Sequence, residues 1–267
     1  LENSFIKFIN KTPPTGKAII CIDNNNIKKI LHKIKNKNIL TYGESKKAIY
    51  QIKKIRYNLD NTTFDLNFKD KDKKIKNIRS INVKLLGKHN VLNAAAALIV
   101  CLNLGANLNL AKNSLKGFSG VQRRMTKVFS KNKNDFFDDY AHHPTEISSV
   151  LSSVKNVYKN KEIVCVFQPH RISRVINLKK EFSKCFKKAD TVLLCPIYTA
   201  NEKLRLNFTY HSFAKLIIKN SNVKLIQVDN EKQLRSFIRQ NTFGKKIYIG
   251  MGAGSISNWM KNLKNIF

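Results

Sequence analysis

From residue 125 onward, the sequence alternates short apolar runs with amphipathic segments of helical spacing. Four of the apolar runs are nearly continuous, which is typical of parallel strands that helices cover on both faces. This part is therefore predicted to be an α/β domain with a mostly parallel, doubly wound sheet. We expect strands at about 125–130, 135–139, 163–168, 191–197, 224–228 and 246–251, and helices at about 144–157, 176–188, 209–219, 230–239 and 255–265.

The beginning of the chain predicts an α/β arrangement of another kind. Apolar runs at 17–22 and 39–42 indicate buried strands, and Asp23 is expected to cap a helix over about 24–33. Between residues 48 and 86, apolar and polar residues alternate with a period of two, which predicts antiparallel strands.

Two helices and a glycine-marked joint follow these strands. The Ala-rich stretch after Gly87 predicts a buried helix, and a second helix is expected at about 108–115. Glycines punctuate the segment 117–124. We therefore predict two domains, 1–122 and 123–267.

The net charge of +33 has two readings, a nucleic-acid binder or a lysine-rich surface. Lysines occur in almost every segment, and arginine, the better reader of bases, is much rarer. We therefore expect no specific nucleic-acid partner, only weak binding to polyanions that salt abolishes.

Hydropathy and cysteine usage favour a globular cytoplasmic protein. Hydrophobic residues make up 42% of the chain, and no run of about 18 apolar residues predicts membrane insertion. The five cysteines are scattered without a CxxC pair, which favours reduced thiols and gives no metal site.

The segment 138–146 concentrates titratable groups where a predicted strand ends and a helix begins. It contains Asp139, Tyr140 and His142, and Pro144 suits the first turn of the helix. Open α/β sheets place their ligand sites at such strand ends. The alternative is a solvated loop with a helix cap.

Three basic side chains follow the predicted strand 163–168. His170, Arg171 and Arg174 are suited to bind an anion, and the two arginines lie one turn apart on a helix. The pair Arg123-Arg124 at the domain joint is also suited to anionic oxygens. The alternative for each group is a set of solvated surface cations.

The start of the Ala-rich helix carries His89, Asn90 and Asn93. An asparagine side chain offers a donor and an acceptor together, which suits the edge of a purine. Capping of the helix by Asn90 is the alternative. The glycine-rich segment 250–255 lacks the complete Gly-x-Gly-x-x-Gly pattern and is interpreted mainly as tight strand-to-helix packing.

Four segments together resemble the signatures of a known family: GKHNVLNAAAAL (87–98), GVQRR (120–124), DDYAHHPTE (138–146) and FQPHRISR (167–174). In this order they resemble the Mur ligases, and most closely the branch that joins L-alanine to UDP-N-acetylmuramate in peptidoglycan synthesis. The resemblance implies a three-domain enzyme that uses ATP and Mg²⁺ and forms an acyl phosphate. It identifies the chain as the later part of the central ATPase domain followed by the Rossmann-like, doubly wound C-terminal domain.

The resemblance also implies roles for individual residues. Asn90 and Asn93, beside His89, would meet the adenine, Arg124 the ATP phosphate or ribose, and Asp139 the ribose hydroxyls. The place where L-alanine meets the acyl phosphate would be lined by Tyr140, His142, His170, Arg171 and Arg174.

The sequence departs from the family in lacking the Gly-Lys-Thr phosphate loop, since Gly16-Lys17 is followed by Ala18. We therefore expect a fragment that shows no alanine-dependent ATP hydrolysis by itself. The alternatives are a related Mur-type ligase with another amino acid or peptide, a basic nucleic-acid-binding module, and a remnant that only binds the amino acid. The oligomeric state is not predicted.

Overall fold

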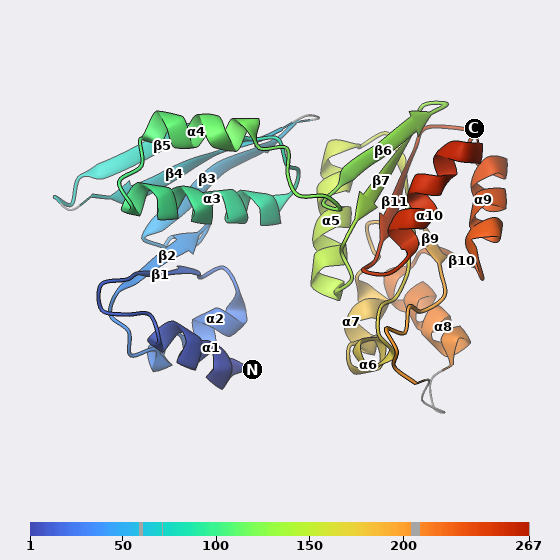
Figure 1. Cartoon of the computed structure of the whole chain (residues 1–267), viewed down its shortest axis with the longest axis horizontal. Coiled ribbons are helices and arrows are strands. Elements are labelled where there is room, and N and C mark those ends of the chain that lie inside the picture. The colour runs from blue at the N-terminus through green and yellow to red at the C-terminus, as the bar shows by residue number, and fades with distance from the viewer. Residues whose placement is uncertain (59–60, 71, 204–208, 267) are drawn as a thin grey trace. The chain divides into compact units, whose positions relative to one another are not determined.

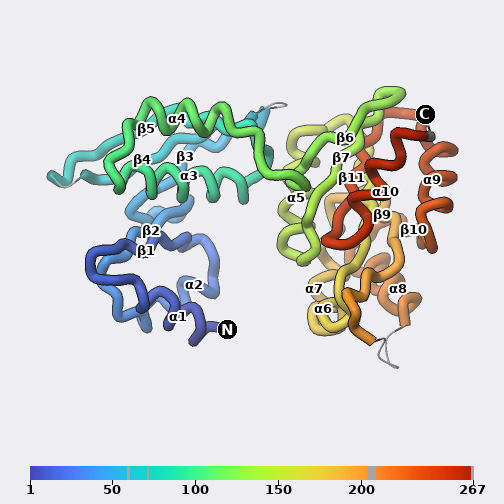
Figure 2. Tube along the Cα trace, viewed as in Figure 1, coloured from blue at the N-terminus to red at the C-terminus, as the bar shows by residue number. Residues whose placement is uncertain are grey.

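The computed structural model describes residues 1–58, 61–70, 72–203 and 209–266. The chain forms two compact units, residues 1–119 and 120–267, which are followed along the trace in Figure 2. This division falls three residues before the predicted boundary. Both units combine helices with a sheet, so the predicted α/β class is confirmed.

The first unit contains a five-stranded sheet in the order β1-β2-β3-β4-β5. Its strands are β1 (Ala18–Cys21), β2 (Ile39–Gly43), β3 (Tyr50–Tyr57), β4 (Thr62–Lys69) and β5 (Ile75–Val83). The first three run parallel, and β3, β4 and β5 pair antiparallel. The antiparallel strands predicted from the period of two are therefore confirmed.

The helices of the first unit are α1 (Glu2–Asn10), α2 (Asn25–Ile30), α3 (Lys88–Asn103) and α4 (Leu108–Gly117), with a short 3₁₀ turn, η1 (Leu31–Lys33). Helix α3 buries Val91, Ala95 and Leu98 against the sheet in one continuous core. The predicted capping of α2 by Asp23 is wrong. Asn24 caps this helix instead, because the Asp23 carboxylate accepts the backbone N–H groups of residues 44 and 45 after β2.

The second unit contains a six-stranded sheet in the order β10-β9-β8-β11-β7-β6. Its strands are β6 (Thr126–Lys131), β7 (Asn134–Asp139), β8 (Glu162–Phe167), β9 (Thr191–Leu194), β10 (Lys224–Gln227) and β11 (Lys246–Met251). All neighbouring strands pair parallel except β6, which runs antiparallel to β7. The predicted doubly wound sheet is confirmed.

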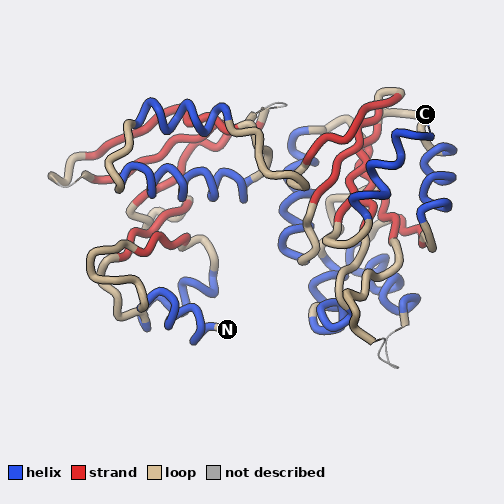
Figure 3. The backbone as a smooth tube through the Cα atoms, viewed as in Figure 1, coloured by secondary structure: helices blue, strands red, loops and turns tan. Residues whose placement is uncertain are grey.

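Helices cover both faces of this sheet, as Figures 1 and 3 show. They are α5 (Pro144–Val157), α6 (Ile172–Asn177), α7 (Lys179–Lys184), α8 (Tyr210–Ser221), α9 (Glu231–Gln240) and α10 (Ile256–Asn262), with the 3₁₀ turn η2 (Leu263–Ile266). One face packs against α5 to α8 and the other against α9 and α10, in two separate apolar cores.

Two predicted boundaries in this unit are wrong. The helix expected at 176–188 starts earlier, directly after Arg171, and is broken at Leu178 into α6 and α7. The strand expected at 191–197 ends at Leu194, since Pro196 has no N–H to continue the ladder. The earlier helix start shortens the loop after β8, whereas the earlier strand end places more of the chain in the loop after β9.

Candidate functional site

The carboxyl ends of three parallel strands meet at one edge of the second sheet. Asp139 and Phe167 pair on either side of Met251, so β7, β8 and β11 end level with one another. Two further backbone bonds join the loops that follow, from Gln168 N to the Met251 oxygen and from Gly252 N to the Asp139 oxygen. The polar side chains after these strands therefore gather at one edge.

The loop after β7 combines a helix cap with two rings, Tyr140 and His142, that take no part in the cap. The His143 ring accepts the Thr145 N–H, and Glu146 reaches back to the N–H groups of His142 and His143, which makes a capping box for α5. The alternative of a helix cap thus accounts for His143 and Glu146. It leaves Tyr140 and His142 to be explained.

Two of the three basic side chains after β8 lie close together. Arg174 Nη1 lies 3.3 Å from His170 Nδ1, one helical turn away. Burial, and then the Arg174 charge, lower the pKa of His170, which favours the neutral imidazole. Arg171 is exposed, at the residue before α6, with a φ of +66°.

The two loops are connected by a row of rings. The Tyr140 ring lies edge-on to His142, with centroids 5.0 Å apart, and His142 lies 5.9 Å from His170. Tyr198, from the loop after β9, stacks on His170 at 5.5 Å and an interplanar angle of 6°. The structure therefore brings together the predicted residues Tyr140, His142, His170 and Arg174.

Tyr198 is a site residue that the sequence analysis missed. Its backbone bonds to Pro169 and Arg171 on either side of His170, at 2.8 and 2.9 Å. A Cβ on Gly254 would lie 2.5 Å from the Tyr198 ring, so this glycine leaves the space that the ring needs. The signal that was available is its position after a predicted apolar strand, the rule that identified His170.

The two arginines of the joint have different environments. Arg123 is half-buried: its Nη2 donates to the Gly252 oxygen, and its Nε lies 3.6 Å from the buried Asp138 carboxylate. Its guanidinium also covers the Tyr140 ring at 4.7 Å. Arg124 is exposed. Arg123 therefore supports the loops, and Arg124 is left available for a ligand.

Asp139 lies beneath the surface of this site. It is 1% exposed, and its two oxygens accept the N–H groups of Met125 and Ala141, each at 2.8 Å. Burial raises the pKa of Asp139 to about 6, against the lowering effect of those two bonds. In this structure both oxygens hold the loops together.

The raised pKa of Asp139 predicts a pH dependence of stability. Between about pH 4 and pH 6 the folded chain holds a proton that the unfolded chain has lost, so the free energy of unfolding falls as the pH rises. A shift of one pKa unit corresponds to about 1.4 kcal/mol, so the rise of the Asp139 pKa from 3.8 to about 6 lowers the free energy of unfolding by about 3 kcal/mol over this range. Urea unfolding between pH 4 and 7 should show this slope, and Asp139→Asn should flatten it. Equal slopes in both proteins would contradict the assignment.

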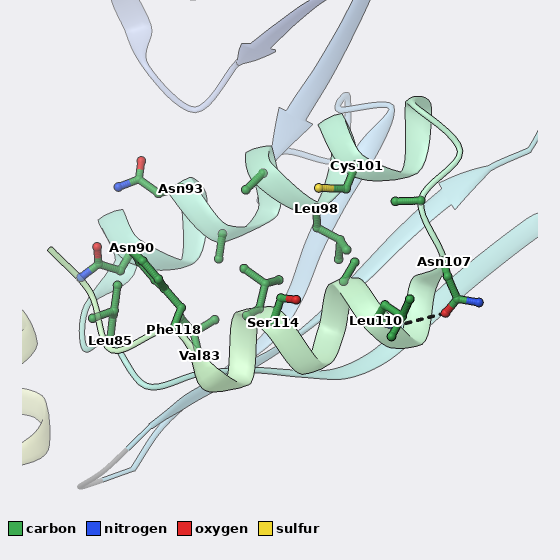
Figure 4. A pocket seen from close by; sticks show the side chains of 15 residues that line it. Val83, Leu85, Asn90, Asn93, Leu98, Cys101, Asn107, Leu110, Ser114 and Phe118 are labelled. Atoms are coloured by element: carbon green, nitrogen blue, oxygen red, sulfur yellow. Dashed lines mark hydrogen bonds between the residues drawn. The ribbon is translucent and has the colours of Figure 1, made fainter.

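A separate apolar cavity of about 700 Å³ lies between α3 and α4 in the first unit. Figure 4 shows Asn90 and Asn93 at one end, beside Leu85 and Phe118. Asn90 is 7% exposed and its Nδ2 donates to the Leu86 oxygen, so it does not cap the helix. Asn93 is exposed. The half-buried His89 is not part of this lining.

The described residues show neither a metal centre nor a membrane span. Within those ranges, no three His, Cys, Asp or Glu side chains gather in a way that could hold a metal ion. None of the helices there combines the length and apolar character that a bilayer crossing needs.

Comparison with known sequences identifies relatives. Residues 1–101 match the Mur ligase middle domain, and residues 123–249 match the Mur ligase glutamate ligase domain. The UDP-N-acetylmuramate--L-alanine ligase of Pelagibacter ubique is 52% identical over 100% of this chain and 57% of its own length. That of Hydrogenobaculum sp. is 38% identical over 97% of this chain and 55% of its own length. The chain thus spans little more than half of these relatives.

Solved structures of Mur ligases share the fold. The UDP-N-acetylmuramate-alanine ligase MurC of Thermotoga maritima matches 97% of this chain and 61% of its own, with a TM-score of 0.69 at 22% identity. MurF of Acinetobacter baumannii matches 97% of this chain and 54% of its own, with a TM-score of 0.72 at 17% identity. Since two consecutive Mur ligase domains account for most of its sequence, the chain belongs to the Mur ligase family.

Proposed function

We propose that this chain serves an ATP-dependent ligase that joins L-alanine to UDP-N-acetylmuramate through an acyl phosphate, in peptidoglycan synthesis. The observation that carries the proposal is the group of His142, His170 and Arg174 at the carboxyl edge of the second sheet. The 52% identity to a UDP-N-acetylmuramate--L-alanine ligase supports the substrate pair. The reaction belongs in the cytoplasm, where the sequence predicts the protein to reside.

The second unit would hold the amino acid. Arg171 is exposed, and Arg174 lies one turn further along α6, so the two guanidiniums can bind the carboxylate of L-alanine. Tyr140 and Tyr198, which are 37% and 43% exposed, would form an aromatic wall for a small substrate. His170 would lie next to the reacting carbonyl.

The first unit would hold the adenine of ATP. Asn90 and Asn93 place amide groups at one end of a mainly apolar cavity, which suits a flat heterocycle with polar edges. The Nδ2 of Asn90 is used by Leu86, so its Oδ1 is the group left to meet the base. His89, at the start of α3, would contribute from beside the cavity.

Arg124 and Asp139, in the second unit, are each proposed to bind part of a nucleotide. The exposed Arg124 would meet the ATP phosphate or ribose. A contact between Asp139 and the ribose hydroxyls needs the segment around Met125 to open, because that carboxylate is now buried.

Mg²⁺ would accompany ATP mainly through the phosphate oxygens. The described residues do not themselves form a cluster that fits a metal ion, so no step here depends on one. When bound, ATP supplies the phosphoryl group that activates the muramate carboxylate. The residues of this chain then bind and orient the amino acid and stabilise charge on the reacting oxygen.

Binding of L-alanine tests the proposal on the second unit. Calorimetry should show saturable binding to the chain, weakened at least about tenfold in Arg171→Ala, because a charge-assisted pair to the carboxylate is lost. Arg239→Ala, an exposed arginine on α9, is the matched control and should bind as the unchanged chain does. Unchanged affinity in Arg171→Ala would count against this site. L-serine and glycine, titrated in parallel, would reveal a related ligase with another amino acid.

A further inference from the structure

The surroundings of His142 determine which of its ring nitrogens carries the hydrogen. Its Nδ1 lies 2.8 Å from the Tyr140 carbonyl oxygen and 3.7 Å from Glu146 Oε2. Both neighbours are acceptors, since this carboxylate already accepts the N–H groups of His142 and His143. Nδ1 must therefore donate, and in a neutral ring the Nε2 of His142 keeps a free lone pair.

The surroundings of His170 determine the opposite arrangement. Its Nδ1 lies 3.3 Å from Arg174 Nη1, and a guanidinium can only donate. Nδ1 must therefore accept, which puts the hydrogen of the neutral ring on Nε2. The stacked Tyr198 ring, itself placed by two backbone bonds and by the space at Gly254, holds the His170 imidazole in this orientation.

The two rings thus offer one acceptor and one donor within the same site. Their centroids are 5.9 Å apart, and in the described ranges neither Nε2 atom has a hydrogen-bond partner. We propose that His142 Nε2 takes a proton from the ammonium group of the incoming amino acid, while His170 Nε2–H donates a hydrogen bond to the carbonyl oxygen under attack. This division of roles rests on the ligase function proposed above.

The amino acid enters as an ammonium ion and gives one proton to His142 Nε2, which becomes an imidazolium. The freed nitrogen lone pair forms the C–N bond to the acyl phosphate, and the carbonyl π electrons move to the oxygen that His170 faces. When that carbonyl re-forms, the C–O bond to phosphate breaks with its electron pair. The second proton leaves nitrogen for the departing phosphate, and His142 releases its own proton to water.

The positions of the ring hydrogens test the proposal in the 267-residue chain itself. Long-range ¹H–¹⁵N spectra near pH 7.5 should show His142 with its hydrogen on Nδ1 and His170 with its hydrogen on Nε2. Arg174→Lys should preserve the His170 tautomer, because it keeps a donor, and Arg174→Ala should allow both tautomers to mix. The same tautomer in both rings, or the reverse pair, would overturn the proposal.

Titration with L-alanine tests the catalytic roles. The ¹⁵N resonance of His142 Nε2 should move toward the position of a protonated nitrogen. The His170 Nε2 atom should keep its hydrogen, so its ¹⁵N resonance should stay at the position of a protonated nitrogen. His142→Asn, whose amide can replace the Nδ1 donor but not the Nε2 acceptor, controls for indirect effects on His170. Calorimetric binding without a shift at His142 would refute the base role. Absence of binding would contradict the proposed function, while the spectra of the free chain would still decide the acceptor–donor pair.

Discussion

Gly252→Ala should destabilise the second unit by about 3 kcal/mol, because strain and overpacking at this position add. The residue has a φ of +152°, which side-chain-bearing residues rarely adopt, and a Cβ would lie 2.7 Å from the backbone oxygen of Gln168. That oxygen cannot yield easily, since the Gln168 side chain is bonded to Ser255 and to the first turn of α10 through Ile256.

The Gly252→Ala substitution should also disturb the candidate site, because Gln168 is followed directly by Pro169 and His170. We expect weaker L-alanine binding together with the lowered stability, measured by urea unfolding and calorimetry. Gly244→Ala is the matched control: φ is +89° there too, yet the nearest atom to a Cβ is Lys246 Cε at 4.0 Å. The Gly244→Ala variant should lose only about 1 kcal/mol of its free energy of unfolding. Equal losses in both variants would contradict the close approach at Gly252.

Arg174→Ala should lower the kcat/KM of an active ligase for L-alanine by about 100-fold or more, since it removes two interactions at once. The substrate carboxylate loses a guanidinium, and His170 loses the donor that fixes its tautomer. The assay needs a complete enzyme, so we suggest a chimera in which this chain replaces the matching 57% of the Pelagibacter ubique ligase.

Matched variants in the chimera separate the two contributions. Arg174→Lys retains a cation and a donor and should recover part of the rate. Lys180→Ala, an exposed cation on α7, should have little effect. A full rate in Arg174→Ala would show that Arg174 does not belong to the site.

Local patterns were sufficient to predict most of the second unit. The helix expected at 144–157 agrees with α5 at both ends, because Pro144 and a run of helically spaced apolar residues specify it within the segment itself. The strand ends that carry His142 and His170 were also predicted, since a parallel sheet brings its carboxyl ends to one edge.

The failures have non-local causes. Asp23 does not cap α2, because its carboxylate bonds to backbone 21 and 22 residues further along the chain. Arg123 and Arg124 look equivalent in the sequence, yet only the first meets the buried Asp138. The place of Tyr198 beside His170 depends on the pairing of two loops and on Gly254, which no local pattern reports.

Alanine-dependent release of phosphate by the chimera tests the central claim most directly. With ATP, UDP-N-acetylmuramate and L-alanine present, the account predicts phosphate release together with formation of the alanyl amide, and neither product when L-alanine is omitted. A folded chimera that binds ATP and L-alanine but forms no amide would contradict the claim that this chain serves an L-alanine ligase.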